Sequence, residues 1–120
     1  MDQEFHTTPS SFFDTSVAGY VGGGRNASNS AQSSIDKFAF PSDSRSTLAA
    51  SLSVAIRSLT GFSNPSVAGY SAGGNNESIA VATIDKIAFS TDSKSTTTSL
   101  SAGRQNGAGF ADFGVAGYVA

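Results

Sequence analysis

Short segments in which apolar and polar residues alternate occur along most of the chain. The clearest is residues 34–40. In an extended strand, Ile35 and Ala39 would point to one face of a sheet, and Phe38 would point to the other. This two-residue periodicity favours β-structure. Three neighbouring segments have similar character, and we predict strands at residues 16–21, 47–54 and 57–63.

One stretch has helical spacing instead. In residues 48–59 apolar side chains recur every three or four positions. The matching stretch later in the chain, residues 97–107, is rich in Thr and Gly and is a poor helix former. Because the two stretches should share one fold, we predict an all-β chain.

The strand pattern belongs to an internal repeat. The run Val-Ala-Gly-Tyr at residues 17–20 returns at 67–70 and 115–118. Ile-Asp-Lys at 35–37 returns at 84–86. The spacing is about 48 to 50 residues, a period typical of propeller blades. Several matched blocks keep the same order, so the similarity is a true repeat.

The repeat predicts how the chain is organised. Length differences between its copies fall between the matched blocks, where surface loops tolerate them. We expect one repeat domain over residues 1–120, with a first strand and amino-terminal flank at 1–15, a first repeat at 16–65, a second repeat at 66–113 and the start of a third at 114–120.

Composition narrows the range of functions. Charged residues make up 13% of the chain and the net charge is −2, so there is no broad basic field for nucleic acid or an anionic membrane. The absence of cysteine excludes disulfides, thiolate metal sites and thiol catalysis. No apolar run reaches the ~20 residues of a membrane-spanning helix, and residues 1–4 lack the basic start of a secretory signal. The location stays open between a virion and the cytoplasm.

The order of these blocks resembles the kelch repeat. In that family an apolar strand ends in a double glycine, an alternating strand follows a polar loop, and an arginine leads into the next apolar strand. The corresponding positions here are residues 22–23 and 73–74, residues 35–40 and 84–89, and Arg57 and Arg104. The Gly-Tyr-x-Gly-Gly-Gly pattern at 19–24 also resembles propeller arrays of phages and environmental marine sequences. The tryptophan of the kelch fourth strand is absent here.

This resemblance implies β-propeller blades of four antiparallel strands, about two and a half blades per chain. The tyrosines Tyr20, Tyr70 and Tyr118 would then pack between blades, each with its hydroxyl at a polar edge. A propeller closes with at least about four blades. We therefore expect either a homo-oligomer, with a trimer of about six blades preferred, or further repeats of a longer chain.

One loop differs most between the repeats and is the candidate binding site. Its polar residues suit a glycan or protein partner, because loops that vary on a constant scaffold commonly form binding surfaces. The candidate ligand-binding residues are Arg25, Asn26, Asn29, Gln32, Asn75, Asn76 and Glu77.

No catalytic arrangement is visible in the sequence. His6 has no carboxylate or nucleophile at a suggestive spacing. Adjacent Asp36 and Lys37 would point to opposite faces of a strand, so they are not a catalytic pair. Asp43 and Asp92 lie in Ser-rich turns, where bonds to the backbone are more common than cation sites. We expect no enzyme activity, no metal and no cofactor.

Two functions remain open at this point. The first is a non-enzymatic propeller module for recognition or scaffolding, related to phage, that closes a ring by self-assembly or belongs to a longer array. The alternative is a purely structural repeat of a fibre, a β-solenoid or propeller without a ligand.

Overall fold

The structure is a computed structural model that describes residues 10–14, 18–40, 42–112 and 114–120. These residues form ten strands and no helix, so the all-β prediction is confirmed for them. The prediction about His6, and the start of the predicted strand at residues 16–17, lie outside the described residues.

The strands form two four-stranded antiparallel sheets and one hairpin, each in simple up-and-down order. The first sheet contains β1 (Ser10–Asp14), β2 (Ala18–Gly22), β3 (Ile35–Ala39) and β4 (Ser44–Thr47). The second sheet contains β5 (Thr60–Asn64), β6 (Ala68–Ala72), β7 (Ile84–Ala88) and β8 (Ser93–Thr96). The hairpin contains β9 (Gly109–Asp112) and β10 (Ala116–Val119).

The predicted strand at residues 47–54 is wrong. The strand there, β4, ends at Thr47, and the next 12 residues of the chain contain no strand before β5 begins at Thr60. The other predicted strands correspond to β2, β3 and β5. Because β5 pairs with β6, each sheet begins one strand earlier than the repeats at 16–65 and 66–113.

The segment between β4 and β5 leaves the ladder because its apolar side chains fill the interior. The Leu48 amide still bonds to the Ile35 carbonyl at 2.9 Å, but further on the segment is held by isolated backbone bonds and bridges instead of a continuous ladder. Leu52, Ile56 and Leu59 are at most 6% exposed. Their burial explains the helix-like spacing in the sequence, although the backbone is irregular.

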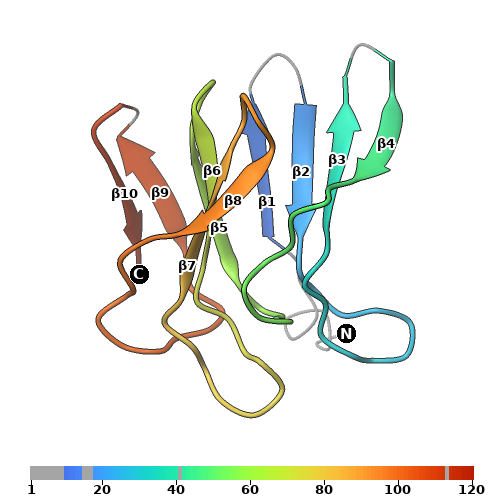
Figure 1. The fold of residues 1–120 in the computed structure, drawn as a ribbon. Coiled ribbons are helices and arrows are strands. Elements are labelled where there is room, and N and C mark those ends of the chain that lie inside the picture. Colours follow the sequence, from blue (N-terminus) through green and yellow to red (C-terminus); the bar gives the residue numbers. More distant parts are fainter. Residues whose placement is uncertain (1–9, 15–17, 41, 113) are drawn as a thin grey trace.

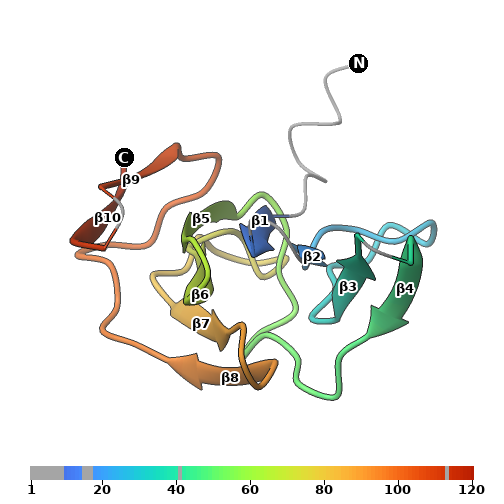
Figure 2. The same cartoon turned by 90° about the horizontal axis from the view of Figure 1, so that it is seen from above.

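The sheets stand beside one another with their strands running in similar directions (Figure 1). Seen from above, they fan out: β1, β5 and β9 lie on the inner side, and β4 and β8 lie outside (Figure 2). Contacts join β1 to β5 and β5 to β9, so the first strand of each unit meets the first strand of the next.

The core fills the space between the first and second sheets. Side chains of the first sheet and of the β4–β5 segment meet side chains of β7 and the turn after it. The buried cluster consists of Ala18, Tyr20, Ile35, Leu52, Ile56, Leu59, Ile87 and Phe89. The two repeats therefore stabilise each other by burying apolar surface between them.

Candidate functional site

The two sheets are joined by an anchor around Tyr20. The Tyr20 ring is 1% exposed and stacks on Phe89 of the second sheet, with 5.2 Å between ring centroids. The Tyr20 hydroxyl donates to Asp92 Oδ1 at 2.9 Å, and Lys37 Nζ donates to Asp92 Oδ2 at 2.9 Å. The expected packing between units, with the hydroxyl at a polar edge, is confirmed for Tyr20 but not for Tyr118, which is 47% exposed.

Asp85 makes a second polar link between the sheets. Its carboxylate is 4% exposed and accepts bonds from the Ser53 amide at 2.8 Å and the Ser53 hydroxyl at 2.6 Å. The Thr96 hydroxyl also donates to Asp85, at 2.9 Å. These bonds satisfy a buried carboxylate, so Asp85 holds the β4–β5 segment in place.

Loops of the two sheets meet at one end of the molecule, where Glu77 connects them. The Glu77 carboxylate accepts a bond from the Ala31 amide at 2.6 Å. Oε1 of the same carboxylate lies 3.3 Å from Arg25 Nη2 and 3.2 Å from Arg57 Nε. We call Arg25, Arg57 and Glu77 the Glu77 cluster. Its three side chains carry one net positive charge.

The other predicted binding residues lie in the same loops but form bonds within them. Asn29 accepts a bond from Arg25 Nη1 at 2.7 Å, and Gln32 donates to the Ser30 and Ala31 carbonyls. The side-chain oxygens of the three remaining asparagines accept bonds from amides of their own loops: Asn26 from Ser30, Asn75 from Glu77, and Asn76 from Ser78 and Ile79. Of these predicted residues, Arg25 reaches the Glu77 carboxylate, and Asn29 contacts that arginine.

The match of Arg57 with Arg104 as repeat partners is wrong by one residue. The Gly24 amide bonds to the Ile56 carbonyl, and the Gly74 amide bonds in the same way to the Arg104 carbonyl, each at 2.8 Å. Arg104 therefore occupies the position of Ile56. Arg57 belongs instead to the Glu77 cluster, and its backbone pairs with Asn75 of the next sheet.

Sequence reasoning missed the contacts of Arg57 and Asp92, because both side chains bond to residues of another repeat. The spacing in the sequence could have suggested the Asp92 contact. Asp92 follows Lys37 by 55 residues, slightly more than one repeat, so it lies in the corresponding part of the next sheet. Nothing in the sequence links Arg57 to Glu77, because the loop that carries Glu77 has no matching acid in the first repeat.

The contacts of Glu77 affect how it titrates. The hydrogen bond from the Ala31 amide, and then that from Arg57, lower the pKa of Glu77 below its usual value of 4.5. A carboxyl group whose pKa is lower in the folded state stabilises that state above the ordinary pKa. The contribution is lost as the pH falls through the lower, folded-state pKa.

We predict that the link between the loops survives to a pH below the usual Glu pKa and then opens. The NMR shift of the Ala31 amide should move at this low pH in the parent chain and stay flat in Glu77→Gln. The control Asp36→Asn removes a half-exposed carboxylate elsewhere and should keep the transition. Movement of the Ala31 signal at the ordinary Glu pKa would contradict the assigned contacts.

In the described part of the chain, no group of three or more His, Cys, Asp or Glu side chains is placed to hold a metal ion. Over the same residues the structure contains no helix with the length and apolarity needed to cross a membrane.

A groove of about 280 Å³ lies between the second sheet and the β9–β10 hairpin. The sheet contributes Phe62, Tyr70, Ile84 and Thr97 to its walls, and the hairpin contributes Asp112 among others. The groove is lined by different residues from the Glu77 cluster.

Comparison with known proteins gives no further assignment. No protein-family model matches the chain, and no curated protein matches it.

Proposed function

We propose that the chain is a non-enzymatic recognition module built from β-propeller blades, in which the Glu77 cluster and its loops contact a polar partner. The first and second sheets would be two complete blades, and the β9–β10 hairpin would be the inner half of a third. The observation that carries the recognition role is the Glu77 carboxylate, which joins loops of two repeats into one surface.

The radial arrangement supports the blade interpretation. Each unit starts with an inner strand that contacts the inner strand of the next, as Figure 2 shows. Propeller blades are four-stranded antiparallel sheets arranged in this way around a centre. Two full blades do not close such a ring, so the proposal includes further blades from other copies, three chains giving about six blades, or from further repeats.

The partner proposed for the Glu77 cluster is a glycan that carries acidic groups. The net positive charge of the cluster favours an anion, and guanidinium groups bind carboxylate and sulfate oxygens through directed hydrogen bonds. The Arg25 and Arg57 side chains are 17% and 15% exposed, so each reaches the surface from a fixed position. Rigid donors lose less entropy on binding than mobile ones.

A glycan array with acidic and neutral sugars tests the recognition role, followed by titration of any hit in solution. The variant Arg25→Gln/Arg57→Gln, which removes both positive charges of the cluster, should lose at least about tenfold in affinity, the equivalent of ~1.4 kcal/mol. Arg45→Gln is the matched control, because Arg45 is 64% exposed on the first sheet and lies outside the cluster. Binding that survives the double substitution would exclude the cluster as the site.

A second candidate is a purely structural repeat without a ligand. The observation in its favour is that the side-chain oxygens of Asn26, Asn75 and Asn76 already accept bonds inside their own loops. Loops stabilised in this way need no partner. An array on which no glycan binds would favour this candidate over recognition.

A further inference from the structure

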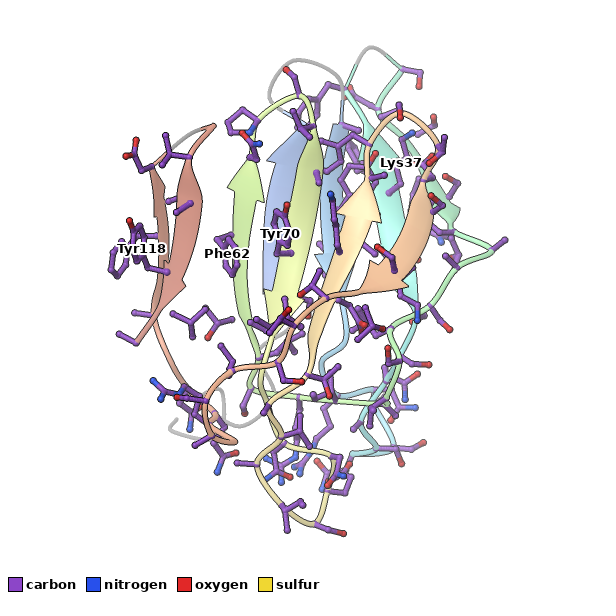
Figure 3. All side chains as sticks on the ribbon, turned by 60° about the vertical axis from the view of Figure 1, so that its left-hand side comes forward. Lys37, Phe62, Tyr70 and Tyr118 are labelled. Carbon is purple, nitrogen blue, oxygen red and sulfur yellow. The ribbon has the colours of Figure 1, made fainter. Side chains whose placement is uncertain are left out.

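The groove between the second sheet and the β9–β10 hairpin lies beside three neighbouring side chains of that sheet. Phe62, Tyr70 and Lys86 are direct neighbours across β5, β6 and β7, so they share one face of the sheet. The Phe62 and Tyr70 rings stack with 5.0 Å between centroids, and Lys86 Nζ lies 5.9 Å from the Tyr70 centroid. In Figure 3 Phe62 projects toward the β9–β10 hairpin, and Tyr118 points from the hairpin away from the second sheet.

The same row occurs in the first sheet, where the structure shows what covers it. Tyr20 and Lys37 are paired across β2 and β3, as Tyr70 and Lys86 are across β6 and β7. The β7–β8 hairpin of the second sheet lies over Tyr20 and Lys37. Its Phe89 stacks on Tyr20, and its Asp92 accepts bonds from both Tyr20 and Lys37.

The second sheet has no such cover. Among the described residues, no carboxylate pairs with Lys86 and no group bonds to the Tyr70 hydroxyl. Burial differs accordingly: Tyr20 and Ile35 are buried at 1% and 0% exposure, whereas Tyr70 and Ile84 at the matching positions are only half-buried. The hairpin covers the inner end of the row, because a Cβ atom on Gly117 would collide with the Phe62 ring.

The hairpin also has a free edge beside the groove. In the first and second sheets the strands β2 and β6 each pair with a neighbour on both sides. Within the described part of the chain, the matching strand β10 pairs with β9 alone. Backbone groups on an open edge bind an added strand readily. A hairpin equivalent to β7–β8 would pair with the open edge of β10 and would also cover the exposed row of side chains.

We propose that this groove binds a β-hairpin with the sequence pattern of β7–β8: an apolar-Asp-Lys-apolar strand, an aromatic residue, and a turn aspartate three residues later. This inference deepens the blade interpretation and rests on it. The first strand of the bound hairpin pairs with β10 in the register by which β7 pairs with β6. Its lysine then lies opposite Tyr118, and the apolar residue after that lysine lies opposite Gly117. The turn aspartate accepts bonds from Tyr70 and Lys86.

A synthetic peptide of residues 80–101 of this chain is the probe, because it contains the whole β7–β8 hairpin. Fluorescence anisotropy of the labelled peptide, titrated with the full chain, should show saturable one-to-one binding. The peptide variant Asp92→Asn and the chain variant Lys86→Gln should each weaken binding about tenfold, because each removes a charge-assisted hydrogen bond. NMR shift changes should appear in β10.

Matched controls separate this site from the rest of the chain. The peptide variant Ser90→Ala and the chain variant Arg45→Gln change exposed groups outside the contact and should leave affinity unchanged. No binding by a monomeric chain, or binding insensitive to Asp92→Asn and Lys86→Gln, overturns the proposal. A chain that is oligomeric by sedimentation and refuses the peptide overturns it if Lys86→Gln leaves the oligomer intact, because the copy in the groove then makes no bond to that lysine. The glycan titration is independent of all these results.

Discussion

Replacing Phe89 by alanine is expected to lower the free energy of unfolding by about 3 to 5 kcal/mol, the range for removing a buried aromatic side chain. Phe89 is 6% exposed and lies between the two sheets, where its ring stacks on Tyr20. The substitution leaves a cavity in the contact that holds the repeats together. Urea unfolding followed by circular dichroism measures the effect as a lower midpoint.

The chain contains its own control for this experiment. Phe40 occupies the same place in the first repeat but is 41% exposed, because no sheet among the described residues lies against that side. Phe40→Ala should therefore cost less than about 1 kcal/mol. Equal losses for Phe40→Ala and Phe89→Ala would show that the sheets are not packed as described.

This pair of phenylalanines also shows how far the sequence could predict the fold. Alternation in residues 35–39 and 84–88 was sufficient to find β3 and β7, because one side of each strand is more apolar. The resemblance to propeller blades implied that Tyr20, Tyr70 and Tyr118 pack between units, which holds for Tyr20 but not for Tyr118, which is 47% exposed. The two phenylalanines have the same local pattern, however, and only the position of the neighbouring sheet makes one buried and the other exposed.

The β4–β5 segment was predicted wrongly for a related reason. Its leucine and isoleucine spacing reflects side chains that reach the core from an irregular backbone, and periodicity alone cannot separate this from a strand. Leu52 is 4% exposed even though its amide bonds to the Ser33 carbonyl outside any ladder. The sequence showed that these side chains are apolar enough to be buried, but it did not show that they reach the core from an irregular backbone.

The candidate site was only partly predictable. The variable loop identified Arg25 and Glu77 as polar surface residues, and the structure places their side chains 3.3 Å apart. Their contact joins positions 52 residues apart, so it depends on how one repeat stacks on the next. Arg57 enters the same cluster from the end of the β4–β5 segment, whose path the sequence did not predict.

The double glycine at residues 73–74 leads to the second large expected effect. Gly74 has a φ of +102°, a value that residues with a side chain rarely adopt. A Cβ atom there would lie 2.8 Å from the Arg57 carbonyl oxygen and 2.7 Å from Ile56 Cγ1. The Gly74 amide and carbonyl also bond to Arg104 and Val81, at 2.8 Å each, so the backbone has little room to move.

Gly74→Ala is therefore expected to cost about 2 to 5 kcal/mol, from ~1–2 kcal/mol of backbone strain and ~1–3 kcal/mol of overpacking. Gly114→Ala is the control, because Gly114 has a φ of +81° but no atom within 4 Å of the added Cβ. It should show the strain alone. Urea midpoints of the two variants measure the difference, and a loss at Gly74 no larger than that at Gly114 would mean that the backbones of the two sheets do not approach each other at this glycine.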